Sequence, residues 1–176
     1  GTLHEGAELA AQVKLSPTWE ATAVLAAGEY LYNSRPSATV TRDNSDTALA
    51  TDRTVYWKNF RVGGMPQKAA SIGLRYSAPQ YWSLGANLNW FGDIYLDPNP
   101  DRRTAEAVEP FVSEDPQWTE LLQQTKLDDG YTLDLFFTKS WQFKHKYRIG
   151  FNVSVGNVQN NTDLITGGYE QLRYDP

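Results

Sequence analysis

Residues 82–90 read Trp-Ser-Leu-Gly-Ala-Asn-Leu-Asn-Trp, and apolar side chains alternate there with small or polar ones. Successive side chains of a β-strand point to opposite faces, so this period of two predicts a strand with one apolar and one polar face. Strands of globular proteins average about five or six residues, whereas a tilted membrane-crossing strand needs roughly nine to eleven. The length of the run therefore favours the wall of a membrane barrel.

Other runs along the chain repeat this alternation, although Phe136 breaks the polar side of one of them. They cover residues 7–15, 19–28, 70–76, 131–138 and 147–156. Together the runs predict an all-β chain, an antiparallel up-and-down meander of about six long strands.

The connections between the runs alternate in length. Those at 16–18, 77–80 and 143–146 are short, whereas those at 33–66 and 98–130 are long. Outer-membrane barrels show this asymmetry, with short periplasmic turns and longer extracellular loops.

The two long loops have patterns of their own. In the first, residues 38–41 and 54–57 are predicted to pair as a hairpin. In the second, a short helix is predicted over 100–108 and another from 116 to about 125, with Asp115 as its N-cap. Trp118, Leu121 and Leu122 would share one side of the second helix.

Aromatic residues gather at the ends of the predicted strands, where a spanning barrel has its interfacial belts. Those beside the short connections are Trp19, Tyr81, Trp82 and Trp141, and Trp90 and Tyr131 lie near the opposite ends. We expect these six to be membrane-interface residues. The alternative is that Trp and Tyr are simply common in strands.

Composition excludes several classes of protein. The 176 residues include no cysteine, which rules out disulfides and cysteine-based metal or catalytic sites. A net charge of −5 without a basic run argues against nucleic-acid binding. No stretch approaches the roughly 18 apolar residues of a spanning helix. The mean hydropathy of −0.54 is low, but barrel strands are only half apolar and escape such averages.

Several polar residues are candidates for solute binding. On the polar side of the predicted strands we expect a barrel lumen to be lined by Asn87, Asn89, Asp93, Arg148 and Asn152. Such a lining binds polar solutes, or it is a solvated wall or a contact surface for a plug.

Two arginines of the second long loop are further candidates. Arg102 and Arg103 would contact an acidic ligand or the phosphates of a surface lipid. The alternative is that they pair with Glu106 or Glu109 within the loop.

Catalytic and metal sites are not predicted, and neither is a cofactor. The two histidines are His4 and His145, and His145 lies in a basic turn where a solvated role is expected. Asp93, Asp97 and Asp101 are four residues apart, which does not match the spacing of an EF-hand calcium loop. We therefore expect no enzyme.

Short motifs in a fixed order resemble one family. They lie at 30–36, 43–44, 56–59, 64–67, 81–82 and 93–95, followed by Asn-Pro-Asp-Arg-Arg-Thr at 99–104, Lys-Ser-Trp at 139–141 and Gly-Gly-Tyr-Glu-Gln-Leu-Arg at 167–173. This order is similar to that of TonB-dependent outer-membrane receptors, in the branch with a carboxypeptidase-regulatory-like domain at the N-terminus.

The resemblance implies a position in a larger protein. Residues 1–176 would be a single fragment of a 22-stranded barrel in the bacterial outer membrane, without the plug, the TonB box and the last strand. As wall and extracellular loops, the fragment would serve the active import of a bulky solute. The implied partners are outer-membrane lipid, the TonB complex through the missing N-terminal parts, the solute and a surface lipoprotein.

Two other functions are compatible with the alternation. One is the wall of a passive porin or channel, which the strand pattern does not distinguish from a receptor. The other is a soluble β-sheet module that binds glycans on exposed Trp and Tyr rings.

Overall fold

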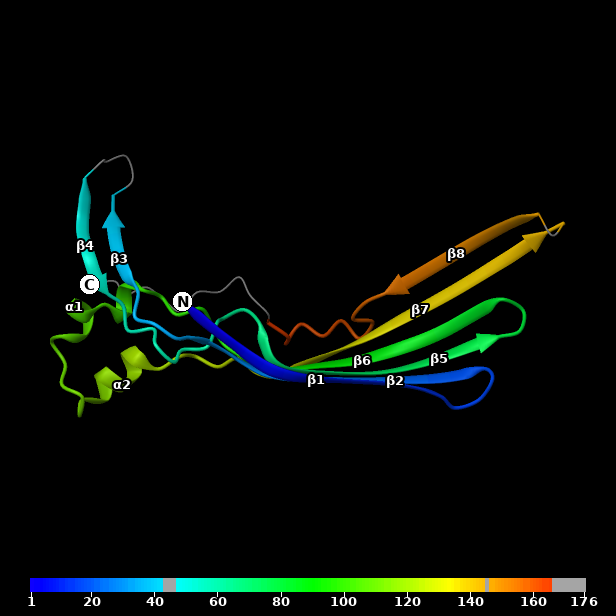
Figure 1. Ribbon diagram of the computed structural model, residues 1–176, viewed down its shortest axis with the longest axis horizontal. Coiled ribbons are helices and arrows are strands. Elements are labelled where there is room, and N and C mark those ends of the chain that lie inside the picture. Colours follow the sequence, from blue (N-terminus) through cyan, green and yellow to red (C-terminus); the bar gives the residue numbers. More distant parts are fainter. Residues whose placement is uncertain (43–46, 145, 166–176) are drawn as a thin grey trace.

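The computed structural model describes residues 1–42, 47–144 and 146–165, and the fold is mostly β, with 59% of residues in strands and 9% in helices. Six strands form one antiparallel sheet in the order β1-β2-β5-β6-β7-β8 (Figure 1). Their bounds are Thr2–Lys14 for β1, Trp19–Tyr32 for β2, Pro66–Ala78 for β5, Trp82–Ile94 for β6, Gly130–Phe143 for β7 and Tyr147–Val155 for β8. The predicted meander is confirmed.

The register of the sheet keeps like residues in the same rows. Leu88 of β6 pairs with Ile72 of β5 and Leu133 of β7. The next residue, Asn87, pairs with Gly73 and Asp134. Because cross-strand partners lie on the same face, apolar residues meet apolar neighbours and polar residues meet polar ones.

Tight turns join the strands at one end, and long loops leave the other (Figure 1). The hairpin of β3 (Ser37–Thr41) and β4 (Ala48–Thr54) projects from the loop end. The second long loop carries the 3₁₀ helix η1 (Asp101–Arg103) and the helices α1 (Ala105–Val108) and α2 (Pro116–Leu122). We call the described part of these two loops the loop cap.

The predicted second strand of the hairpin was wrong. The hairpin forms and its first strand is confirmed, but the residues that pair with β3 are 48–54, which share only Thr54 with the predicted 54–57. Val55 lies beyond the hairpin, bridges to Thr104 and is only 1% exposed. The apolar residues at 55–57 thus reflect packing inside the loop cap rather than strand alternation.

The predicted helix over 100–108 is interrupted at Thr104, whose backbone is extended at φ −73° and ψ 156°. Its hydroxyl accepts a hydrogen bond from the Ala107 backbone N–H at 3.2 Å and caps α1. In the second helix, Trp118, Leu121 and Leu122 share one half-buried side as expected. That helix ends at Leu122, earlier than predicted. Asp115 is its N-cap residue as predicted, but the carboxylate accepts from the Val112 N–H and makes no hydrogen bond to the helix.

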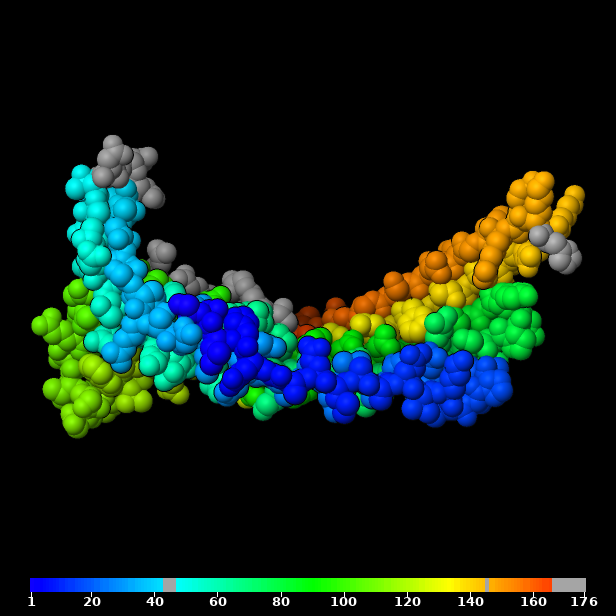
Figure 2. All heavy atoms as spheres, viewed as in Figure 1, coloured from blue at the N-terminus to red at the C-terminus, as the bar shows by residue number. Residues whose placement is uncertain are grey.

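The hydrophobic core is small, and most of it lies in the loop cap or at the end of β6 that adjoins it. Among the described residues, the buried apolar side chains are Val55, Ala78, Ile94 and Val108. The sheet itself is a single layer, and every residue of β1 and β8 is exposed. Figure 2 shows the strands of this sheet curving upward at the β7–β8 side, without a second layer above them. No helix in the described ranges is long and apolar enough to cross a membrane.

Candidate functional site

One side of the sheet, here called the apolar face, is aliphatic and open. The pairing of adjacent strands places on it Leu9, Val13, Leu25, Ile72, Leu74, Leu84, Leu88, Leu133, Leu135, Phe137, Ile149, Phe151, Val153 and Val155. Leu9 is 66% exposed and Ile72 is 64% exposed. A contiguous apolar surface of this extent marks an interaction with a membrane or another protein.

An aromatic row crosses the apolar face at its turn end. Trp19 and Tyr76 lie 5.1 Å apart between ring centroids, Tyr76 and Trp82 lie 5.2 Å apart, and Trp82 and Phe137 lie 6.3 Å apart. Trp141 is at the same end, where it pairs with Ile149. Aromatic rings therefore line this end across four strands.

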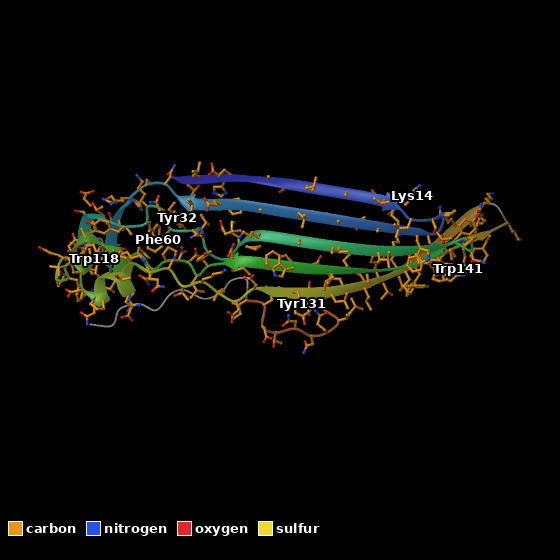
Figure 3. The ribbon with its side chains drawn as sticks, turned by 90° about the horizontal axis from the view of Figure 1, so that it is seen from below. Lys14, Tyr32, Phe60, Trp118, Tyr131 and Trp141 are labelled. Carbon is orange, nitrogen blue, oxygen red and sulfur yellow. The ribbon has the colours of Figure 1, made fainter. Side chains whose placement is uncertain are left out.

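The other predicted interface residues fall into two places. Trp90 and Tyr131 are register partners at the loop end of the apolar face. Tyr81 lies in a tight turn, with φ of 60°, and is 64% exposed. Figure 3 shows Tyr131 and Trp141 far apart along β7.

The two aromatic ends are separated by about one membrane thickness. Tyr131 and Trp141 are ten residues apart, which corresponds to roughly 34 Å along an antiparallel strand. A tilt of about 40° reduces this to about 26 Å, close to the apolar band of about 25 Å in outer-membrane barrels.

A lysine interrupts the apolar face near the turns. Lys139 pairs with Trp82 and Phe151. Its ammonium group donates to the Gln80 carbonyl at 2.7 Å. The charge is thereby directed to the end of the sheet, as is usual for a lysine whose methylene chain covers apolar surface.

The opposite side, the polar face, carries four of the predicted solute-binding residues. Asn87 pairs with Asp134, and Asn152 pairs with Thr138. Asn89 and Arg148 lie in other rows of the same face. The structure thus brings these residues to one surface, as the alternation predicted.

Hydrogen bonds link the polar side chains across the strands. Asn89 accepts from the Ser71 hydroxyl at 2.7 Å and donates to the Thr132 hydroxyl at 3.2 Å and the Asp134 carboxylate at 2.8 Å. Arg148 donates to the Ser140 hydroxyl at 3.2 Å. The Asn89 side chain is thereby hydrogen-bonded to both neighbouring strands, and of these residues it is the least available to a solute.

The placement of Asp93 differs from the prediction. A positive φ of 55° at this residue ends the regular alternation of β6. Its carboxylate pairs with the ammonium groups of Lys68 at 2.6 Å and Lys126 at 2.5 Å. Lys68 lies in an apolar-face row opposite Gly92. Asp93 therefore joins strands β5 and β6 to the loop cap instead of lining the polar face with Asn87.

Arg103 is enclosed in the loop cap, with 0% of its surface exposed. Its guanidinium donates to the Asn99 carbonyl at 3.2 Å and the Gln123 carbonyl at 3.0 Å, and it stacks over the Phe60 ring at 5.0 Å. Burial lowers the pKa of this guanidinium to about 10, and the adjacent charge of Arg102 acts in the same direction. The predicted ligand contact of Arg103 is thus replaced by a structural role.

Two of the depressions on the described surface include predicted solute-binding residues. One of about 200 Å³ is on the polar face, and its lining includes Glu20, Thr22, Arg75, Asn87 and Phe136. Another of about 490 Å³ is on the loop cap and includes Arg102. Phe136 was visible in the sequence as a break in the alternation, but its place beside Arg75 and Glu20 depends on the strand register.

Metal ligands do not gather in the part of the chain that the structure describes, where no group of three or more His, Cys, Asp or Glu residues could hold an ion. His145 and the motif residues at 43–44 and 167–173 lie outside the described residues.

No family model, curated protein or solved structure matches this chain. The resemblance to TonB-dependent receptors therefore remains a prediction from the sequence motifs.

Proposed function

We propose that the chain forms wall strands and extracellular loops of a 22-stranded outer-membrane receptor for TonB-dependent import of a bulky solute. The observation that carries this proposal is the exposed apolar face between its two aromatic ends. Lipid acyl chains would cover such a face, and the aromatic side chains would lie at the two membrane interfaces. The described chain holds no packing layer that could cover it in water.

The edges of the sheet support the same proposal. Both outer strands, β1 and β8, have a long edge whose backbone groups are open to a further strand. Proteins usually cover, shorten or charge such edges, and a closed barrel removes them altogether. In the receptor, the neighbouring wall strands would pair with β1 and β8.

Curvature is the third supporting feature. Gly73, Gly85 and Gly150 all lie in polar-face rows. Small residues on one face let a sheet bend toward that face, as the inside of a barrel requires. The polar face would then line the lumen, and its asparagines and arginines would border the path of the solute.

A glycan-binding module is less well supported. Such a module presents aromatic platforms among polar groups, whereas the centre of the apolar face is aliphatic and its rings lie at the ends. A passive channel would share all of the sheet features, so a transport experiment has to separate it from a receptor.

The decisive assay is liposome swelling with the purified receptor of which this chain is proposed to be a segment. Liposomes that contain it are placed in isosmotic solutions of neutral sugars of increasing size. A gated receptor without TonB should give swelling no faster than protein-free liposomes. Steady swelling that decreases with sugar size would contradict the receptor and establish a passive channel.

A further inference from the structure

The depression on the loop cap has the size of a small-molecule site. Its volume is about 490 Å³, within the roughly 300–1,000 Å³ usual for ligand pockets. It is lined by Arg102, Glu120, Gln123, Gln124, Thr125 and Lys126. These residues come from η1, from α2 and from the extended segment after α2, which Figure 1 shows at the end of the molecule opposite the tight turns.

Hydrogen bonds fix the walls of this depression. The Gln124 side chain accepts from the Arg61 N–H at 2.8 Å and donates to the carbonyls of Arg61 at 2.6 Å and Leu96 at 2.9 Å. The Thr125 carbonyl accepts from the Leu96 N–H at 3.0 Å. The Gln123 carbonyl is held by buried Arg103. A ligand would therefore meet a formed site and lose little affinity to ordering it.

The charges around the depression are of both signs. Lys126 is already paired with Asp93 at 2.5 Å, so its charge is largely compensated. Arg102 and Glu120 remain, and no ion pair joins them within the described ranges. A guanidinium and a carboxylate that share a depression without pairing form a dipolar site.

Arg102 also has a hydrogen-bonding group without a partner. Its Nε is buried and makes no hydrogen bond to a described residue. A buried donor in this state is destabilising. Arg102 as a whole is only half-buried, so a ligand in the depression would meet the exposed part of its side chain. A carboxylate suits this guanidinium, because arginine binds carboxylates through two parallel hydrogen bonds.

We propose that this depression binds a small zwitterion of the amino-acid or short-peptide class, with its carboxylate on Arg102 and its ammonium group near Glu120. The site is defined by the loop cap alone. The identification of this ligand with the imported solute rests on the proposed receptor function.

Calorimetric titration of the protein in detergent micelles tests the site, with triglycine as the probe. N-acetyl-triglycine lacks the ammonium charge, and triglycine amide lacks the carboxylate. Triglycine should bind, and each blocked peptide should bind at least tenfold more weakly. Equal affinity for the three peptides, or no binding of triglycine, would overturn the proposal without depending on any variant.

Variants assign each charge to its residue. Arg102→Gln should weaken triglycine binding at least tenfold and remove the preference over triglycine amide. Glu120→Gln should remove the preference over N-acetyl-triglycine instead. Glu114→Gln, an exposed change in the same loop outside the depression, should bind as the unmodified protein does. Preferences that stay unchanged in both Arg102→Gln and Glu120→Gln would overturn the assignment.

The outcome is separable from that of the receptor proposal. Peptide binding by a protein that proves to be a passive channel would keep the site and remove its role in active import. A gated receptor that binds none of the peptides would remove the site alone.

Discussion

The ring of Phe136 lies directly over Gly85, its register partner on the adjacent strand, so that a Cβ at Gly85 would overlap the ring. The aromatic side chain fills the space that the glycine leaves on the polar face. Such a pair holds two strands together and lets the sheet bend locally.

Gly85→Ala should therefore destabilise the sheet. The added methyl group has to displace the half-buried Phe136 ring, and because the ring lies on an open face the cost should fall at the lower end of the about 1–3 kcal/mol of overpacked cores. Gly150→Ala is the matched control, because nothing lies within 4 Å of a Cβ at that position of the same face. Urea unfolding of the protein folded into lipid vesicles measures both changes. Equal unfolding free energies for the two variants would contradict the assigned packing.

Arg103→Met should loosen the loop cap and leave the sheet intact. The change removes the hydrogen bonds from the guanidinium to the carbonyls of Asn99 and Gln123, and a hydrogen bond to a charged group contributes about 1.5–3 kcal/mol. Hydrogen exchange should quicken at the Tyr56 and Leu96 amides and stay slow at Leu88. Arg42→Met, at an exposed position, is the control. Unchanged exchange throughout the cap would show that Arg103 does not organise it.

Gln124→Glu should make the stability of the loop cap depend on pH. The introduced carboxyl group faces the carbonyls of Arg61 and Leu96, to which only its protonated form can donate. Folding should therefore raise the pKa of this group. The stability that the protonated group contributes to the loop cap is present at pH 4 and is lost as the pH rises toward 7. Exchange of the Arg61 amide should be faster at pH 7 than in the unmodified protein, after correction for intrinsic rates.

Gln117→Glu, on the exposed side of α2, should show no such dependence. The same pH response in both variants would mean that Gln124 does not link the two loops. The comparison thus tests the three hydrogen bonds of one side chain.

The faces of the sheet could be predicted from the sequence because a period of two needs only local information. Alternation alone places Leu88 and Asn87 on opposite sides of a strand, whatever the register. The turn ends could be predicted as well, because the short connections fix which strands are neighbours. The motif resemblance predicts a receptor family, which the fold does not test, and it remains a prediction.

The loop cap could not be predicted in the same way. Arg103 reads as an exposed loop cation in the sequence, and only contacts with distant Phe60 and Gln123 bury it. Asp93 leaves its expected face because of a positive φ, which no local pattern announced. Val55 looked like part of a strand because a residue buried in a loop is as apolar as one in a sheet.

The central claim is that the apolar face contacts lipid, and single cysteines along β6 test it most directly. The chain has no cysteine of its own, so each introduced thiol can be labelled with a polarity-sensitive fluorophore in lipid vesicles. Labels at Leu84 and Leu88 should emit at shorter wavelength and be quenched by nitroxides on the acyl chains. Labels at Asn87 and Asn89 should be quenched by aqueous iodide instead. Iodide quenching of equal strength at all four positions would contradict the account.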